Sequence, residues 1–218
     1  GIISVKKNFS AGDWLKLAKN RISRCLKDRK IPIIVGGTGL YFNTITKGIS
    51  KIPNIDPKTR KKVRSLFKKI GHNNFYEKLL KIDPKVKNKI ISTDSQRVQR
   101  AYEVAFKTNK SLFDWTKETK SDFINYEIKK VFLDTPREEL LKKIFLRTEL
   151  MFKNNCLEEV KKFNLLKLNK SLSANKLIGV QEIGDYLKGV TTLDQCKELI
   201  TIKTRQYAKR QNTWARGH

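Results

Sequence analysis

The sequence has very few residues that bind metals or form disulfides, with three cysteines and two histidines among 218 residues. Cys25, Cys156 and Cys196 are far apart, and no two of them have the C-x-x-C spacing of common metal sites. A structural zinc site needs four close ligands, so the sequence argues against one. Three unpaired thiols are typical of a reducing compartment, and we therefore expect a cytoplasmic protein.

Long apolar stretches are also missing. The longest runs from Ile31 to Val35, contains Pro32, and is much shorter than the roughly 20 residues that a membrane helix needs. Near the amino terminus, Lys6 and Lys7 are followed by polar residues, which is not the pattern of a signal peptide. We therefore expect no association with a membrane.

Acidic residues are few compared with basic ones. The 48 lysines and arginines against 21 aspartates and glutamates give a net charge of +27 and a pI near 10.1. Such a charge favours a polyanionic partner, because each Lys or Arg that neutralises a phosphate releases a counterion. The alternative is the bias of an AT-rich genome, since the excess is mostly lysine and the chain is also rich in asparagine and isoleucine.

The amino-terminal part has the pattern of an α/β protein. Ser10 is a suitable N-cap for a helix, and the β-branched run from Ile31 to Val35 is typical of a strand buried on both faces. This run leads into a glycine turn, Gly36-Gly37-Thr38-Gly39, and a second helix is expected from Leu40. Proteins of the α/β class place ligands at such turns, at the carboxyl ends of strands.

Only helix signals occur in the middle of the chain. Asp56-Pro57 combines an N-cap with a proline at the first helical position, and Asp83-Pro84 repeats this pair. Gly71 lies between them and predicts a helix stop.

The chain therefore divides into three predicted parts. Residues 1–48 belong to an α/β core, residues 49–125 form an all-helical insertion domain, and residues 126–218 combine a return to the core with C-terminal helices. Within the last part, Val131 to Asp134 is a predicted strand. The residues alone thus predict a basic α/β protein with a helical insertion that binds RNA.

The glycine turn is the first candidate site. Glycine adopts positive φ and has no side chain, so Gly36-Gly37-Thr38-Gly39 would let a ligand approach the backbone closely. It is not a Walker A motif, which needs Gly-Lys-Ser/Thr after a longer loop, and the chain contains no such motif. The alternative is a tight turn between a strand and a helix, without a ligand.

Two basic segments are candidates for RNA contacts, and Gln96-Arg97-Val98-Gln99-Arg100 is the first. Gln96 and Arg100 share a helical face with Arg97 beside them, and arginines and amides near a helix start can contact phosphates or base edges. The alternative is the solvated face of an amphipathic helix.

The second segment, Thr204 to Arg216, lies on a helix that Thr192 and Gln195 are expected to cap. It mixes basic, amide and aromatic side chains. Aromatic rings between cations suit RNA whose bases are unstacked. The alternative is that the aromatic rings pack in the core and the basic side chains face water.

No catalytic group can be assigned from the residues themselves. The sequence offers no Ser-His-Asp set, no catalytic Cys-His pair and no carboxylate dyad, because Glu158 and Glu159 are adjacent and point in different directions on a helix. Arg147 follows the second predicted strand on a long helix, and nothing local distinguishes it from a surface arginine.

Taken together and in order, these segments resemble the bacterial tRNA dimethylallyltransferases, which are isopentenyl-diphosphate:tRNA transferases. The similarity covers nearly the whole chain, and the G-G-T-G-L-Y and A-K-R-Q-x-T-W segments are specific in combination. The matching segments are Phe9 to Asp13, Pro32 to Tyr41, Asp56 with Arg60, Asp94 with Gln96-Arg97, Arg100 to Val104, and Thr204 to Trp214.

The resemblance implies the transfer of a dimethylallyl group from dimethylallyl diphosphate to N6 of the adenosine on the 3′ side of the tRNA anticodon. In this family the base flips out of the anticodon loop, which exposes its reactive edge, and the diphosphate lies against a P-loop with Mg²⁺. The resemblance further implies a P-loop NTPase-like parallel-sheet core, here without its N-terminal part, and an all-helical insertion domain. We expect a monomer that binds the tRNA anticodon stem-loop and dimethylallyl diphosphate.

Individual residues are carried over from the same resemblance. Thr38 matches a threonine that contacts tRNA, Arg60 matches a basic contact on the insertion domain, and Arg147 resembles an arginine that holds the diphosphate. No other catalytic residue is assigned within the chain. The expected tRNA-binding residues are Thr38, Arg60, Gln96, Arg97, Val98, Gln99, Arg100, Lys209, Arg210, Gln211, Asn212, Thr213, Trp214 and Arg216.

The sequence departs from the family pattern in two places. The P-loop, the segment with the general-base aspartate and the Mg²⁺-binding segment are not in this chain and should lie before Gly1, so we expect the chain alone to be incomplete for catalysis. Val180 and Gln181 stand where the family usually has an aromatic and a basic residue, which weakens that tRNA contact.

Three other interpretations stay open. The first is a tRNA-binding remnant without activity, and the second is an adenylate isopentenyltransferase, which uses a free nucleotide. The helical insertion and the basic Lys209-Arg210-Gln211 run argue against the second, because a mononucleotide needs neither. The third is a relative of the P-loop kinases, which the lack of any resemblance to their phosphate-acceptor chemistry disfavours.

Overall fold

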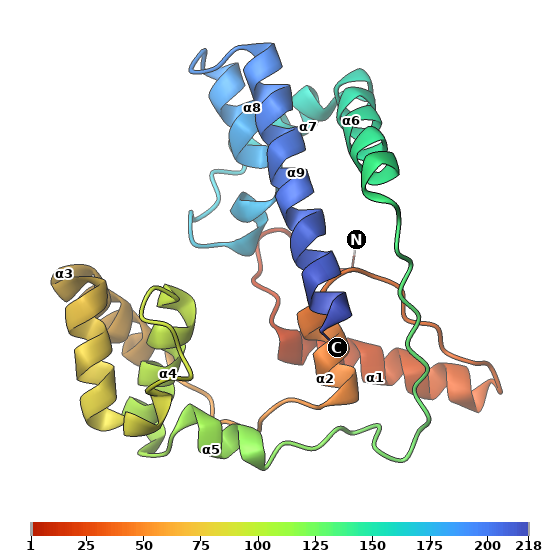
Figure 1. Cartoon of the computed structure of the whole chain (residues 1–218). Helices are drawn as coiled ribbons and strands as arrows, with labels where there is room; N and C mark the ends of the chain where they lie inside the picture. The colour runs from red at the N-terminus through yellow and green to blue at the C-terminus, as the bar shows by residue number, and fades with distance from the viewer. Residues whose placement is uncertain (1, 218) are drawn as a thin grey trace. The chain divides into compact units, whose positions relative to one another are not determined.

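The computed structural model describes residues 2–217, and all regular structure within this range is helical (Figure 1). The chain divides into two compact units: a first unit up to Phe42 and from Ile128 on, and a second unit of Asn43–Glu127. The helices are α1 (Ala11–Lys27), α2 (Gly39–Thr46), α3 (Pro57–Ile82), α4 (Ser95–Thr108), α5 (Leu112–Lys117), α6 (Arg137–Lys153), α7 (Cys156–Leu165), α8 (Val180–Leu187) and α9 (Leu193–Arg216), with short 3-10 helices η1 (Pro84–Val86) and η2 (Ser173–Lys176).

The second unit is built around the packing of α3 against α4. The carboxylate of Asp56 accepts a hydrogen bond of 2.7 Å from the backbone N–H of Thr59, and Pro57 fills the first helical position, so α3 begins where the sequence predicts. At Gly71 the backbone leaves the helical conformation, with φ 77° and ψ 175°, so the predicted stop is confirmed and α3 consists of two helical segments joined at a kink. The buried core consists of Val63, Phe75, Leu79, Val86, Ile90, Val98 and Ala101.

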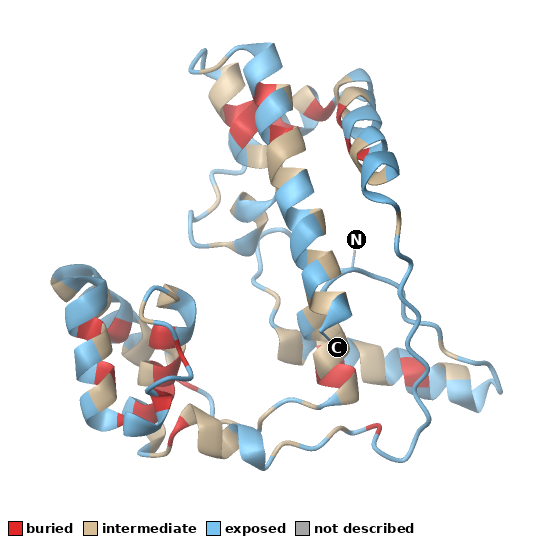
Figure 2. Cartoon of the chain, viewed as in Figure 1, coloured by how far each residue is buried: buried red, intermediate tan, exposed pale blue. Residues whose placement is uncertain are grey.

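In the first unit, α9 packs against α6 and α8. The ammonium group of Lys197 donates a hydrogen bond of 2.8 Å to the Glu149 carboxylate, and the Thr201 hydroxyl donates one of 3.2 Å to the Thr148 hydroxyl. The buried core beneath these contacts consists of Cys156, Val160, Ile183, Cys196 and Ile200 (Figure 2). These contacts hold the amino-terminal half of α9 in place. The carboxyl-terminal half, from Thr204 on, carries the candidate RNA-binding side chains.

The predicted parallel-sheet core is wrong for the part of the chain that the structure describes, since residues 2–217 contain no strand. The run Ile31–Val35 is mostly exposed, with Val35 89% exposed, and Val131 in the second predicted strand is 84% exposed. A strand needs a neighbour that pairs its N–H and C=O groups, and β-branched residues adopt strands only where such packing exists. Neither run has a paired neighbour among the described residues.

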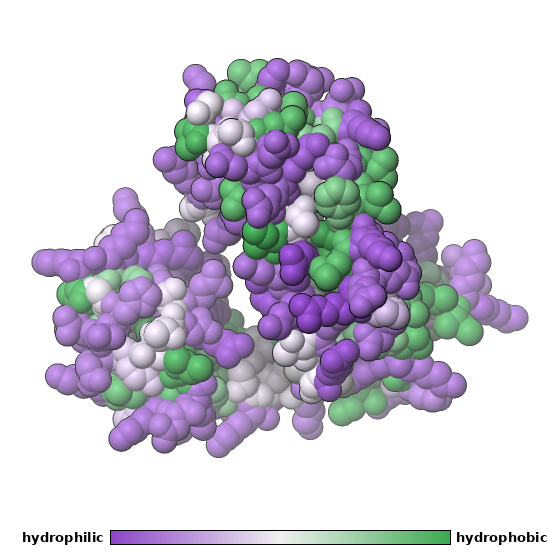
Figure 3. Space-filling model, turned by 45° about the horizontal axis from the view of Figure 1, so that its top comes forward, coloured by the Kyte–Doolittle hydropathy of each residue, from purple (hydrophilic) through white to green (hydrophobic). Residues whose placement is uncertain are grey.

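The second unit contains residues 49–125, the predicted insertion domain. That this unit interrupts a larger core stays a prediction. No helix within residues 2–217 is both long and apolar enough to cross a membrane. Hydrophilic side chains, purple in Figure 3, cover much of the face that is shown there.

Candidate functional site

The glycine turn lies directly against the carboxyl-terminal end of α9. The side-chain amide of Gln211 donates a hydrogen bond of 3.1 Å to the carbonyl oxygen of Gly37. A Cβ atom placed on Gly39 would be 2.2 Å from Cδ2 of Trp214, whose ring stacks on Phe42 at a centroid distance of 6.1 Å. Glycine is therefore required at position 39 because the indole ring occupies the space of a side chain.

Thr38 lies in this turn with an exposed side chain. Its carbonyl oxygen accepts a hydrogen bond of 2.9 Å from the N–H of Tyr41 and so starts α2. The Tyr41 ring in turn stacks on Trp14 of α1, with centroids 4.6 Å apart and planes 8° from parallel. The structure thus brings the turn, α1, α2 and the end of α9 together around Thr38.

The end of α9 presents cations to the solvent. The side chains of Arg205, Lys209, Arg210 and Arg216 are exposed. The Arg210 guanidinium lies over the ring of Tyr207 at 5.7 Å, and this ring is 42% exposed. An exposed ring beside a cation is the arrangement on which unstacked RNA bases pack.

Other predicted residues of α9 have partners within the first unit. Arg216 donates a hydrogen bond of 3.2 Å to the Asp134 carboxylate, and the Thr213 hydroxyl donates one of 2.9 Å to the carbonyl oxygen of Lys209. Asn212 is half-buried. The sequence places all of these residues in one motif; in the structure Arg216 and Thr213 are exposed and also hydrogen-bonded within the first unit.

The predicted segment of α4 belongs to the second unit. Asp94 caps the helix, accepts a hydrogen bond of 3.0 Å from the N–H of Arg97, and pairs with the Arg97 guanidinium at 3.4 Å. Gln96 is exposed, and the side chain of Gln99 is turned back to the carbonyl oxygen of Ser95 at 3.0 Å. Val98 is fully buried in the α3–α4 core, so its side chain has no surface to offer to RNA.

Sequence reasoning missed the environment of Arg60 and Arg100. Both arginines, together with Arg64, lie around the carboxylate of Glu103, which is buried on α4. The spacing of Arg100 and Glu103 predicts an ion pair on one helix. The two arginines of α3 could not be found in this way, because they join the pair only through the packing of α3 on α4.

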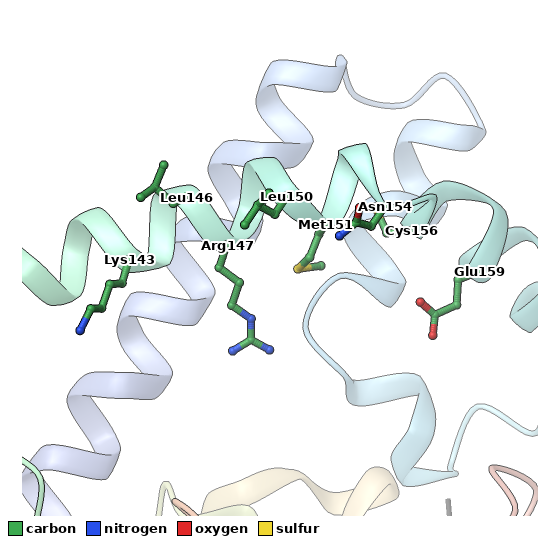
Figure 4. A pocket seen from close by; sticks show the side chains of 8 residues that line it. All are labelled: Lys143, Leu146, Arg147, Leu150, Met151, Asn154, Cys156 and Glu159. Atoms are coloured by element: carbon green, nitrogen blue, oxygen red, sulfur yellow. The ribbon is translucent and has the colours of Figure 1, made fainter.

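Arg147 lines a pocket of about 480 Å³ on α6 and the start of α7 (Figure 4). The side chains of Arg147 and Lys143 extend to the same side of α6, while Leu146 points away. Met151 and Glu159 also contribute to the lining. Lys143 is paired with Glu139 at 2.6 Å, whereas Arg147 has no such partner among the described residues. A free guanidinium in an open pocket suits an anionic ligand.

A second buried carboxylate, Glu182, was also missed. It accepts a hydrogen bond of 2.7 Å from the N–H of Gly179 and another from the ammonium group of Lys203 on α9. Burial raises the pKa of Glu182, but the hydrogen bonds from Lys203 and from backbone N–H groups outweigh burial and lower it. Residues 179–182, which include the departure from the family pattern at Val180 and Gln181, therefore form the start of α8, and Glu182 links α8 to α9 through Lys203.

Within residues 2–217, no group of three or more His, Cys, Asp or Glu side chains could hold a metal ion. The Mg²⁺ that the family resemblance implies is therefore not assigned to a cluster of side chains in this range.

Known proteins with similar sequences and structures agree on one family. The family model described as IPP transferase matches residues 1–218. The tRNA dimethylallyltransferase of Pelagibacter ubique (strain HTCC1062) is 51% identical over 216 residues, which are 99% of this chain and 69% of that protein. The tRNA dimethylallyltransferase of Wolbachia sp. subsp. Drosophila simulans (strain wRi) is 40% identical over 98% of this chain and 72% of its own length.

Solved structures point the same way. A eukaryotic dimethylallyltransferase acting on tRNA matches 97% of this chain and 54% of its own with a TM-score of 0.80 at 25% identity. The full-length tRNA isopentenylpyrophosphate transferase of Bacillus halodurans matches all of this chain and 67% of its own with a TM-score of 0.64 at 29% identity. The resemblance seen in the sequence is confirmed, and the chain belongs to the IPP transferase family.

Proposed function

We propose that this chain is part of an enzyme that transfers a dimethylallyl group from dimethylallyl diphosphate to N6 of the adenosine on the 3′ side of the tRNA anticodon. The observation that carries the proposal is the 51% identity to a tRNA dimethylallyltransferase over 99% of the chain. The glycine turn and the basic end of α9, which carry the specific sequence match, support it because they meet in space.

The first unit contributes a surface for the anticodon stem-loop. The exposed Tyr207 ring beside Arg210 offers a stacking platform, and Lys209 adds a phosphate contact. Thr38 can donate a hydrogen bond to RNA from the turn, since its hydroxyl is exposed next to the Gln211–Gly37 contact. Trp214 stacks on Phe42 and Arg216 pairs with Asp134, and both contacts hold the end of α9 in place. Asn212 and Thr213 are further proposed contacts to the RNA.

The second unit contributes a separate set of contacts to the same RNA. Gln96 and Arg97 are exposed at the start of α4, and Arg60 and Arg100 lie close to Glu103. Arginine side chains and helix starts are common phosphate contacts, which position RNA without reading its sequence. We propose that these residues contribute phosphate contacts to the tRNA.

The diphosphate of the prenyl donor is the proposed ligand of Arg147. Departure of a diphosphate develops negative charge, which the guanidinium of Arg147 would stabilise by charge-assisted hydrogen bonds. Lys143 lies on the same side of α6 but is paired with Glu139 at 2.6 Å, so the proposal rests on Arg147. We further propose that the protein acts as a cytoplasmic monomer, and that the Mg²⁺ of the reaction is held by groups other than those described in this chain.

The proposal is tested with full-length protein, a tRNA and labelled dimethylallyl diphosphate. Label that enters the tRNA and is found by mass spectrometry on the adenosine 3′ of the anticodon supports it. Tight, salt-sensitive tRNA binding without transfer would instead identify a binding protein that has lost the reaction.

Arg97→Ala and Arg210→Ala should each weaken binding to an anticodon stem-loop and reduce the slope of log affinity against log salt by about one. Each change removes one exposed guanidinium that is proposed to contact an RNA phosphate. Fluorescence anisotropy titrations between low and moderate salt measure both quantities. Lys188→Ala removes an exposed cation beyond the other end of α9 and should leave the slope unchanged. Equal slopes for Arg210→Ala and Lys188→Ala would contradict the assignment.

Arg147→Ala should raise the KM for dimethylallyl diphosphate about tenfold, because one charge-assisted contact to the diphosphate is lost. Affinity for tRNA should not change. Lys142→Ala removes an exposed cation from the same helix outside the pocket and serves as the control. Steady-state kinetics at varied concentrations of dimethylallyl diphosphate measure the KM of both variants. An equal rise in KM for Lys142→Ala would show that the effect comes from the loss of net charge and not from a contact of Arg147 with the diphosphate.

A further inference from the structure

We propose that Glu103 is a positioning residue that gathers Arg60, Arg64 and Arg100 into one site for an RNA backbone phosphate. The proposal adds Glu103 and Arg64 to the second unit's RNA contacts. It rests on the proposed function only for the identity of the RNA.

The geometry of the cluster comes from two helices packed side by side (Figure 1). One carboxylate oxygen of Glu103 lies 4.0 Å from Nε of Arg60 and 3.6 Å from a terminal nitrogen of Arg100. The other oxygen lies 3.9 Å from Nε of Arg64. Three guanidinium groups from α3 and α4 thus converge on one carboxylate.

The burial of Glu103 makes this convergence significant. Its side chain is only 6% exposed, and a buried carboxylate is strongly disfavoured unless cations surround it. Conversely, three guanidinium groups this close repel one another, and the carboxylate between them offsets that repulsion. Without it, the long arginine side chains would separate and sample many rotamers in solvent.

The arginines keep donors free for a second ligand. Arg60 and Arg64 approach the carboxylate most closely through Nε, and neither has another charged partner among the described residues. Nε of Arg60 is buried, yet the side chain is 43% exposed, so its exposed part lies elsewhere. Arg64 is 60% exposed.

Neighbouring cations do not share this arrangement. Lys107 is paired with Asp56 at 3.3 Å, and Arg97 is paired with Asp94 at 3.4 Å, so each has a carboxylate of its own. The cluster around Glu103 instead has three cations for one carboxylate and keeps an excess of positive charge. A tetrahedral phosphate accepts hydrogen bonds from several guanidinium groups at once and matches this excess.

The direction of the change in RNA affinity caused by Glu103→Gln distinguishes a positioning role from an effect of net charge. The substitution keeps the shape of the side chain and removes one negative charge beside the RNA. If charge alone governed binding, RNA affinity would rise or stay the same. If Glu103 positions the arginines, affinity falls although the protein has become more positive.

The experiment measures binding of an anticodon stem-loop RNA to full-length protein, with unfolding followed on the same samples. We expect Glu103→Gln to weaken binding about fivefold to tenfold, and to raise the KM for tRNA without changing kcat at saturating tRNA. Glu77→Gln removes an exposed carboxylate from α3 in the same unit and should not weaken binding. A folded Glu103→Gln protein with unchanged or tighter binding would overturn the proposal.

Arg64→Lys provides a second test if Glu103→Gln fails to fold. Arg64 is largely exposed, so this substitution leaves the core intact, keeps the charge and removes only the guanidinium fork. We expect binding to weaken about fivefold, and unchanged binding overturns the proposal. If the wild-type protein binds RNA through this cluster but transfers no prenyl group, the proposed function fails while the phosphate site stands.

Discussion

Replacing Glu182 by alanine is expected to lower the free energy of unfolding by about 2–3 kcal/mol. The carboxylate is 4% exposed, and it accepts hydrogen bonds from the N–H of Gly179 and from Lys203 on α9. Its loss leaves the Gly179 N–H without its partner and removes the tie between α8 and α9. Urea denaturation followed by circular dichroism measures the change.

Glu158 provides the matched control for this prediction. Its side chain is 57% exposed and pairs with Lys161 on the same helix, so Glu158→Ala should change the free energy of unfolding by about 0.5 kcal/mol or less. Similar losses for the two variants would show that the buried contacts of Glu182 contribute nothing beyond those of a surface pair.

The same carboxylate should give stability a dependence on acid pH. Because hydrogen bonds lower the pKa of Glu182 in the folded protein, its contribution is present above the unfolded pKa of about 4.3 and is lost as pH falls through the folded pKa. Glu182→Gln carries no charge at any pH. The stability difference between wild type and Glu182→Gln should therefore shrink below about pH 4. A difference that does not change from neutral to acid pH would contradict this account.

Gly39→Ala is expected to release the end of α9 and to weaken tRNA binding about tenfold, with a loss of about 1–3 kcal/mol in stability. A Cβ atom at this position would be 2.2 Å from the rigid indole ring of Trp214, so the ring must move. Trp214 and Gln211 together hold the last turns of α9 against the turn. Amide hydrogen exchange of residues 205–216 should become faster.

Gly36 offers a control in the same turn. A Cβ atom placed there meets no atom within 4 Å, so Gly36→Ala should leave the hydrogen exchange of α9 unchanged. The neighbouring Gly37 is less informative, because a Cβ atom there meets only the flexible end of Gln211. If both Gly39→Ala and Gly36→Ala leave α9 protected, the contact with Trp214 does not hold the helix end.

The sequence predicted helix starts well, because an N-cap needs only residues within one turn. Ser10 is the N-cap of α1 as predicted, and Thr192 and Gln195 form the predicted capping box at α9. Gly71 interrupts the helical geometry where the sequence predicts a stop, and a second helical segment follows it directly because both segments pack on one core.

The two predicted strands were wrong because a strand, unlike a helix start, depends on residues far away in the sequence. Apolar, β-branched residues at Ile31–Val35 and at Val131 favour a strand only where another segment pairs with them, and residues 2–217 provide no such segment to either run. The partner of a strand lies elsewhere in the chain, so local composition cannot supply it.

In the candidate site, too, some features follow from the local sequence and others only from tertiary packing. The sequence by itself determined the family, the helix caps, the excess of cations and the motifs that contain Thr38, Gln211 and Arg97, because these depend on residue identity and short spacing. Only the tertiary structure decided that Val98 is buried, that Trp214 fills the space beside Gly39, and that Arg60, Arg64 and Arg100 meet at Glu103. These outcomes depend on contacts between helices far apart in the sequence, which form only when packing brings their side chains together.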